Sequence, residues 1–152
     1  MPPFTFNTSR SVRFGASLIL QLGEMTRSEI GCRVLLVTDT GMLATGLVDQ
    51  VQVILANAGV DVTVFSDVVA DPPEAVVLAA TEAAKVADVD AVIGFGGGSS
   101  LDVAKLVAVL AMDNQSLKDI YGVGNITGRR LPLILIPTTS GTGSEVTPIS
   151  IL

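Results

Sequence analysis

The segment Ala91–Lys105 reads AVIGFGGGSSLDVAK, and the segment Leu133–Thr147 reads LILIPTTSGTGSEVT. Each begins with an apolar run of the kind that forms a parallel strand buried on both faces. Each run then passes into a glycine-rich turn, where the backbone is free to approach a ligand closely. A strand, a glycine turn and a helix start together make an anion-binding site. Two such loops in one small domain predict a ligand that carries phosphates and has a second end to hold.

The rest of the chain alternates between strand and helix patterns. A continuous apolar run and a second strand-like segment predict two more strands, and apolar residues at helical spacing or after a helix-start signal predict three helices. The strands are Val34–Val37 and Val62–Phe65, and the helices lie within Leu43–Leu55, Asp71–Val86 and Val103–Leu110. This alternation indicates an α/β fold with a Rossmann-like parallel sheet flanked by helices. We expect residues 1–152 to form a single domain.

The two ends of the chain carry weaker strand patterns. Phe4–Phe6 and Ser11–Phe14 alternate apolar and polar residues, as in a half-buried hairpin, and Ser17–Glu24 can form a short helix. Extended edges pair readily with a second copy, so we expect a homo-oligomer such as a dimer. Ile149–Leu152 reads as a strand cut short, which leads us to expect a domain truncated at its C-terminal end.

Composition narrows the classes of partner. Hydrophobic residues make up 49% of the chain and charged residues 16%, which fits a sheet covered on both faces. The net charge of −6 argues against nucleic acid or an acidic membrane as a partner. The apolar runs are short for a membrane span and the N-terminus lacks a signal-peptide pattern, so we expect a cytoplasmic protein. Cys32, the only cysteine, is expected to be a small buried apolar group.

The first glycine loop offers several donors to a phosphate. The N–H groups of Gly97, Gly98 and Ser99, together with the turn at Gly96, would face a pyrophosphate, and the following helix would add its positive end. The alternative is a tight strand-to-helix turn that binds nothing, because glycine motifs alone are weak signals. Ser99 and Asp102 have the spacing of a capping box, which predicts Ser99 as the N-cap of the helix.

Two charged residues follow this loop. A carboxylate at Asp102 would repel a pyrophosphate unless it faced away, so we interpret Asp102 mainly as an organiser of the loop. Direct contact with the cofactor is the alternative. Lys105 lies about one helical turn further on, and we expect it to pair with Asp102. The alternative for Lys105 is that it leans toward the phosphates.

Asp39 ends the predicted strand that contains Val34–Val37. An acid at that position can accept hydrogen bonds from both ribose hydroxyls of an adenosine and would repel a 2′-phosphate, which predicts NAD rather than NADP. The alternative is an N-cap for the helix that follows. This acid precedes the glycine loop in the chain, whereas in the ordinary dinucleotide fold it follows the loop, so we expect a variant of that fold.

The two glycine-rich segments resemble the paired signatures of the iron-dependent (group III) alcohol dehydrogenases. The family patterns GGGSxxDxAK and PTTxGTGSEVT are matched from Gly96 to Lys105 and from Pro137 to Thr147. The resemblance implies the N-terminal, nucleotide-binding domain of the dehydroquinate synthase-like fold. It also implies oxidation of a small alcohol to an aldehyde or ketone, with hydride transfer to NAD. A divalent metal, usually iron (Fe2+), would polarise the substrate oxygen.

In that family an aspartate and three histidines of a second, helical domain hold the metal. This chain contains no histidine. We therefore expect it to be the cofactor-binding portion of such an enzyme, without the helical metal-binding domain and inactive alone. The two alternatives are a stand-alone nucleotide-binding module and an interaction protein that serves a partner chain.

The resemblance also assigns roles to the second loop. It implies that Thr138 and Thr142 contact the cofactor, with the loop lying against the phosphate and nicotinamide regions. Thr139 and Ser144 offer further hydroxyls, which donate hydrogen bonds without adding charge. The alternative for each of the four is a local bond to nearby backbone.

Two acids near these loops have structural interpretations. Glu145 has no evident chemical partner in the sequence, and we expect it to be structural. Asp71 stands where family members often have asparagine in a loop near the cofactor. Capping of the following helix explains Asp71 by itself.

Overall fold

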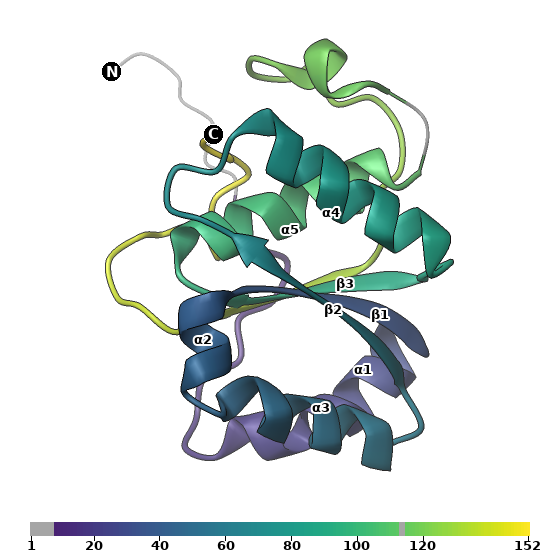
Figure 1. Cartoon of the computed structure of the whole chain (residues 1–152), viewed down its shortest axis with the longest axis vertical. Coiled ribbons are helices and arrows are strands. Elements are labelled where there is room, and N and C mark those ends of the chain that lie inside the picture. Colours follow the sequence, from purple (N-terminus) through teal and green to yellow (C-terminus); the bar gives the residue numbers. More distant parts are fainter. Residues whose placement is uncertain (1–7, 113–114) are drawn as a thin grey trace.

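The computed structural model describes residues 8–112 and 115–152. At its centre lies a sheet of four parallel strands in the order β2-β1-β3-β4 (Figure 1). The strands are β1 (Arg33–Asp39), β2 (Asp61–Val68), β3 (Ala91–Gly96) and β4 (Leu133–Pro137). The four internal strands that the sequence predicts are confirmed, and each extends beyond its predicted range.

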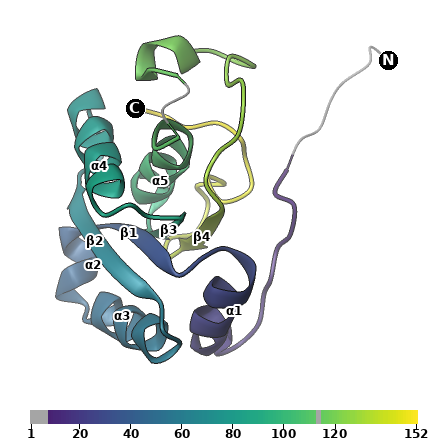
Figure 2. The same ribbon diagram turned by 90° about the vertical axis from the view of Figure 1, so that its right-hand side faces the viewer.

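Helices cover both faces of the sheet (Figure 1, Figure 2). On one face lie α1 (Leu22–Glu29) and α3 (Leu47–Asn57), and on the other lie α4 (Glu74–Val86) and α5 (Gly98–Leu110). Shorter helical segments are η1 (Leu18–Gln21), α2 (Thr40–Ala44) and η2 (Leu117–Ile120). The Rossmann-like α/β prediction is confirmed. Within the described residues, no helix has both the length and the apolar character needed to cross a membrane.

Alternation along the strands builds two hydrophobic cores, because successive side chains point to opposite faces of a sheet. Leu35 and Val37 belong to the core under α4 and α5, whereas Leu36 and Ile93 belong to the core over α1 and α3. All four side chains are fully buried. Burial on both faces explains why these strands read as continuous apolar runs.

The topology creates a switch point between β1 and β3. The chain leaves β1 for β2 on one side and returns to β3 on the other side, where Val37 pairs with Gly94. In open parallel sheets, ligands bind outside the carboxyl ends of the strands at such a point. Asp39 and Gly96 are the last residues of β1 and β3, and Gly96 pairs with Pro137, the last residue of β4, so both predicted loops begin at or beside this switch point.

The strands predicted at the chain ends need correction. Ser11–Phe14 forms no strand, and Phe14 is fully exposed. Phe4–Phe6 lies outside the described residues. Ile149–Leu152 is not a strand either, because side chains of α5 hold its backbone in place of a neighbouring strand.

Three local predictions are also wrong. The helix expected from Asp71 begins at Glu74 with Pro73 as its N-cap, and Asp71 has a φ of 48°. The helix expected within Leu43–Leu55 is interrupted at Gly46, whose φ is 73°, so that α2 and α3 are separate. Cys32 is exposed rather than buried, because it precedes β1 at the amino end of the sheet.

Candidate functional site

Asp39 lies at the crevice, at the end of β1. Its Oδ1 accepts a hydrogen bond from the Met42 N–H at 3.0 Å, and its Oδ2 accepts one from the Ser100 hydroxyl at 3.2 Å. The first bond makes Asp39 the N-cap of α2, so the capping alternative is confirmed. The carboxylate remains partly exposed and therefore accessible to a ligand.

The bond from Ser100 is a contact that sequence reasoning missed. It joins β1 to α5 across 61 positions of the chain. The available signal was a small polar residue in the first turn of the helix that follows β3. The pairing of β1 with β3, which brings the two residues together, was not predicted.

α5 presents an open N-terminus to the crevice. Gly97 is its N-cap, with extended backbone, and no side chain among the described residues caps the helix. The first intrahelical bond runs from the Leu101 N–H to the Gly97 carbonyl. The N–H groups of Gly98, Ser99 and Ser100 consequently have no partner within the helix. Their partial positive charge suits an anion such as a pyrophosphate.

The predicted capping box is wrong, because Ser99 is the second residue of α5 and not its N-cap. Gly97 takes the extended backbone of an N-cap directly after β3 ends, so the helix begins before Ser99 is reached. Asp102 therefore has no capping role. Ser99 is half-buried, and its N–H stays a candidate donor to a phosphate.

Gly96 is required in this loop, and Gly98 leaves little room for a side chain. A Cβ on Gly96, whose φ is 154°, would lie 2.8 Å from Ser100 Oγ and 3.1 Å from Asp39 Oδ2. A Cβ on Gly98 would lie 3.3 Å from Ser144 Oγ. These glycines let β1, α5 and the second loop approach one another, which is a structural need beside any contact with a ligand.

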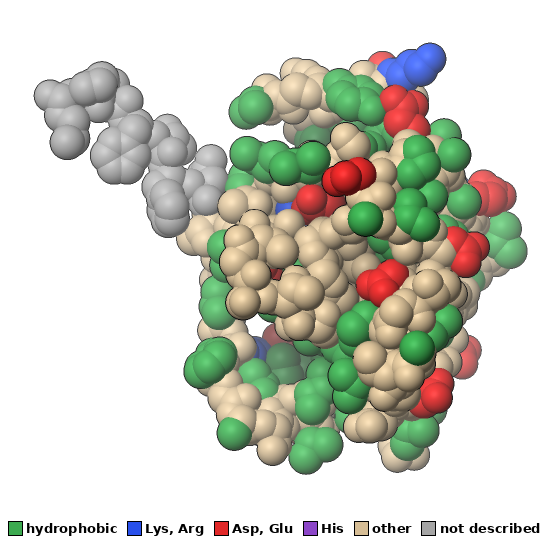
Figure 3. Space-filling model, turned by 60° about the vertical axis from the view of Figure 1, so that its left-hand side comes forward, with side chains coloured by type: hydrophobic (Ala, Val, Ile, Leu, Met, Phe, Trp, Pro, Cys, Tyr) green, Lys and Arg blue, Asp and Glu red, His purple; other side chains and the backbone are tan. Residues whose placement is uncertain are grey.

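The second loop lies next to the first. The Thr138 N–H donates to the Gly96 carbonyl at 2.9 Å, which extends the pairing of β3 with β4. Thr138 and Thr139 are exposed, whereas Ser144 is buried. Figure 3 brings forward the side of the molecule on which this loop lies. Tan atoms, which are backbone and uncharged polar side chains, cover much of the middle of this face. The exposed threonines can therefore meet a ligand at the crevice.

Thr142 has partners within its own loop. Its hydroxyl oxygen accepts from the Ser144 N–H at 3.4 Å and donates to the Glu145 carboxylate, also at 3.4 Å. The local alternative is confirmed for Thr142. The same contact gives Glu145 the structural role that we expected.

Asp102 and Lys105 form a buried pair on α5. Lys105 Nζ lies 2.8 Å from Asp102 Oδ1, with side chains 11% and 8% exposed, so the predicted pairing is confirmed. Lys105 Nζ also donates to the Thr147 carbonyl at 3.3 Å and to the Ile149 carbonyl, and the Ile151 N–H donates to Asp102 Oδ2 at 3.1 Å. The pair thus holds the segment that leaves the second loop.

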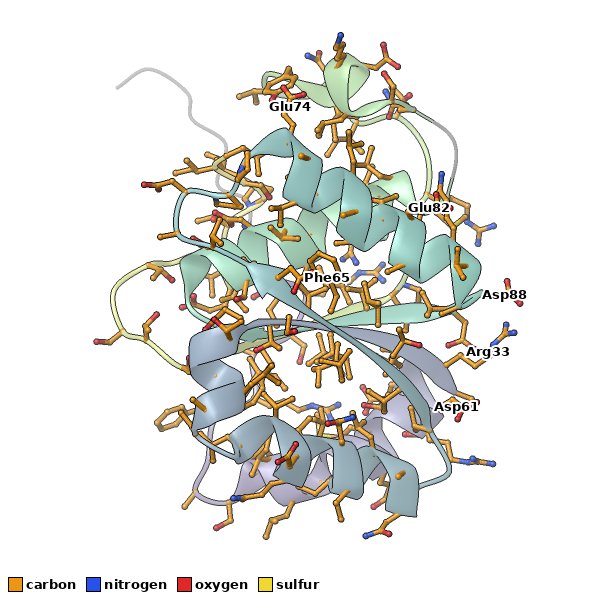
Figure 4. All side chains as sticks on the ribbon, viewed as in Figure 1. Arg33, Asp61, Phe65, Glu74, Glu82 and Asp88 are labelled. Atoms are coloured by element: carbon orange, nitrogen blue, oxygen red, sulfur yellow. The ribbon has the colours of Figure 1, made fainter. Side chains whose placement is uncertain are left out.

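The amino end of the sheet, opposite the candidate site, carries charged side chains. Figure 4 shows Arg33, Asp61 and Asp88 at this end, and Arg33 donates to Asp88 at 2.6 Å. A hollow of about 260 Å³ lies there, lined in part by Arg33, Asp61 and Thr63. It lacks a helix N-terminus with glycine backbone, so we place the candidate site at the carboxyl end.

The residue types gathered at the carboxyl end of the sheet are those that suit a dinucleotide. One partly exposed carboxylate, one uncapped helix N-terminus and several exposed hydroxyls meet at the carboxyl ends of β1 and β3. A metal ion finds no such fit, because the described residues contain no group of three His, Cys, Asp or Glu side chains that could hold one.

Comparisons with known proteins place the chain in a family. The family model for iron-containing alcohol dehydrogenases matches residues 9–152. Long-chain-alcohol dehydrogenase 1 of Geobacillus thermodenitrificans is 50% identical over 125 residues, which cover 78% of this chain and 31% of that protein.

The fold of the chain is also similar to solved structures of related enzymes. NADH-dependent butanol dehydrogenase A of Thermotoga maritima superimposes with a TM-score of 0.83 at 33% identity, covering 96% of this chain and 37% of that one. Sulfoacetaldehyde reductase of Bifidobacterium kashiwanohense, in complex with NAD+, gives a TM-score of 0.82 at 27% identity, covering 97% and 39%. The chain spans about a third of the length of the curated relatives that it matches. Because the family model covers nearly all of it, the chain belongs to the iron-containing alcohol dehydrogenase family.

Proposed function

We propose that this chain binds NAD across the carboxyl ends of β1 and β3, as the cofactor-binding part of an alcohol dehydrogenase. The observation that carries the proposal is the meeting of Asp39 with the open N-terminus of α5 at one switch point. The reaction is the oxidation of a small alcohol to an aldehyde or ketone. Two solved relatives, one an NADH-dependent butanol dehydrogenase and the other a reductase in complex with NAD+, support the choice of cofactor.

The two ends of the cofactor make different demands. The pyrophosphate would lie on the N–H groups of Gly97, Gly98 and Ser99, where the helix dipole favours negative charge. Asp39 would accept hydrogen bonds from the adenosine ribose hydroxyls. Its negative charge would exclude a 2′-phosphate, which favours NAD over NADP.

The second loop would hold the rest of the cofactor. Thr138 and Thr139 are exposed and would donate hydrogen bonds to its phosphate and nicotinamide portions. Thr142 and Ser144 would support this part of the site from inside the loop, because their bond to each other shapes it. Asp102 would contribute indirectly, because it accepts a hydrogen bond from the Ile151 N–H and so positions the segment that follows the loop.

The chemistry is divided between the cofactor and the protein. When bound, NAD accepts the hydride from the alcohol carbon. The residues of this chain bind and orient the cofactor. The metal, usually iron in this family, and the walls of the alcohol pocket would come from outside these 152 residues.

The test is a calorimetric titration of the protein with NAD+ and with NADP+. NAD+ is expected to bind more tightly. Asp39→Ala is expected to lower the NAD+ affinity by about 10- to 100-fold, because hydrogen bonds to a charged group are worth roughly 1.5–3 kcal/mol. Asp61→Ala is the matched control, since it removes an exposed aspartate at the other end of the sheet. Absence of NAD+ binding by the folded protein would refute the proposal.

We also infer that the protein self-associates. Apolar side chains near the N-terminus are well exposed, with Val12 at 69%, Phe14 at 101% and Leu20 at 68%. Exposed apolar groups gathered in one segment favour contact with another chain. Sedimentation equilibrium at several concentrations checks this, and a strictly monomeric protein would contradict it.

A further inference from the structure

We propose that Ser100 is a positioning residue that sets the preference for NAD over NADP by holding the Asp39 carboxylate in place. The inference rests on the proposed function. Ser100 is 1% exposed, and its hydroxyl donates to Asp39 Oδ2 at 3.2 Å. It occupies an unspecified position of the GGGSxxDxAK pattern, so the family signature assigns it no role.

The direction of this hydroxyl is set by its place in α5. Serine and threonine inside helices commonly bond the carbonyl four residues back, as Thr81 of α4 does with the Val77 carbonyl at 2.8 Å. Ser100 is the third residue of α5, so the residue four positions before it, Gly96, lies in β3 and outside the helix. The Ser100 hydroxyl is directed across the crevice to Asp39 instead.

Two donors within the protein fix the two oxygens of the Asp39 carboxylate. The Met42 N–H holds Oδ1 at 3.0 Å, and the Ser100 hydroxyl holds Oδ2. A carboxylate has about four lone-pair sites, so each oxygen keeps one for a ribose hydroxyl. A carboxylate held at both oxygens cannot rotate away from an incoming 2′-phosphate, and the like charges repel at short range. The hydrogen bond from Ser100 to Asp39 therefore helps the carboxylate to bind the ribose of NAD and to repel the 2′-phosphate of NADP.

The surroundings leave little freedom for another residue at this position. A Cβ placed on Gly96 would already lie 2.8 Å from Ser100 Oγ. A larger side chain at position 100 would have little room because Ser100 is 1% exposed, whereas alanine would fit and lose the donor. Because Ser100 belongs to the first turn of α5, its bond also fixes the carboxylate relative to the proposed pyrophosphate site.

The experiment measures the dissociation constants of NAD+ and NADP+ for the protein and for Ser100→Ala by titration calorimetry. Ser100→Ala is expected to reduce the ratio of NAD+ to NADP+ affinity about tenfold, the size that follows from losing one hydrogen bond to a charged group. Thr81→Ala is the matched control, because it removes a buried hydroxyl from α4 and should leave the ratio unchanged.

A double variant tests whether Ser100 acts through Asp39. Asp39→Ala combined with Ser100→Ala should show the same ratio as Asp39→Ala alone. A further fall in the ratio would overturn the inference, because the serine would then act on the cofactor directly.

The remaining outcomes separate the inference from the proposed function. If Ser100→Ala binds NAD+ with an unchanged ratio, the inference fails and the proposed function stands. If the unaltered protein binds neither nucleotide, the proposed function fails and the inference falls with it. If Ser100→Ala does not fold, Ser100→Cys keeps the shape with a weaker donor. A ratio equal to that of the unaltered protein would then overturn the inference.

Discussion

Replacing Lys105 with methionine tests the idea that α5 holds the segment after the second loop. Methionine keeps an unbranched, flexible side chain but removes the ammonium group. That group lies 2.8 Å from Asp102 Oδ1 and donates to the carbonyls of Thr147 and Ile149. Lys105→Met would leave the Asp102 carboxylate buried with only the Ile151 N–H as a partner.

The size of the effect follows from this burial. Removing one partner of a buried ion pair costs roughly 3–5 kcal/mol, because the remaining charge is uncompensated. The Ile151 N–H still bonds Asp102, and the side chains of the pair are 8% and 11% exposed. We therefore expect the low end, about 3 kcal/mol. With a urea slope of about 1.5–3 kcal/mol per molar, the unfolding midpoint would fall by about 1–2 M.

The assay is equilibrium urea unfolding, with hydrogen exchange of the Ile151 amide as a local readout. Asp102→Asn combined with Lys105→Met should be less destabilised than Lys105→Met alone, because the double variant buries no unpaired charge. Faster exchange at Ile151 should accompany the loss of stability in Lys105→Met. If the midpoint of Lys105→Met stays within the error of the unaltered protein, the pair does not hold this segment and our reasoning is wrong.

Two further predictions concern other contacts. Gly96→Ala should destabilise the protein by about 1–3 kcal/mol and weaken NAD+ binding, because the added Cβ would crowd Ser100 and Asp39. Urea unfolding and titration calorimetry measure the two effects. Gly15→Ala is the control in both assays, because a Cβ there meets nothing within 4 Å. Hydrogen bonds from the side chain and then the backbone of Ser116 lower the pKa of Asp119 below its ordinary 3.8. The ionised Asp119 therefore stabilises the folded protein above pH 3.8, and this stabilisation is lost as the pH falls through the lowered pKa. NMR can follow the titration through the chemical shift of the Ser116 amide. A midpoint of this titration at or above pH 3.8 would contradict the prediction.

The fold was predictable where its signal is local. Val34–Val37 and Ala91–Ile93 are apolar on both faces, and this is the mark of a central parallel strand. The order β2-β1-β3-β4 had no such signal, because it depends on which side of β1 each crossover packs. The strand predicted at the C-terminal end was wrong because its structure also depends on a contact distant in the sequence. Ile149–Leu152 has the composition of a strand, but Asp102 and Lys105 hold its backbone, and no sequence period reports that contact.

The candidate site was predictable as a set of residue types and less so as a set of contacts. The two glycine motifs identified Gly96 and the second loop. Asp39 was identified by its place at the end of a predicted strand, and its capping role followed from its place before a helix. Ser99 was misjudged as the N-cap, because a glycine can fill that position without any side-chain signal. Ser100 was missed because its partner lies in a different strand.

The order of strands in space also explains an oddity of the sequence. Asp39 precedes the glycine loop in the chain, the reverse of the ordinary dinucleotide fold. Because β1 and β3 are parallel neighbours, their carboxyl ends meet whichever comes first in the chain. The acid and the phosphate loop therefore need only adjacent strands, and the bond from Ser100 to Asp39 is where the two are joined. A variant that keeps Asp39 and the first glycine loop but breaks this bond should retain the fold and lose the fixed geometry between the proposed ribose and pyrophosphate sites.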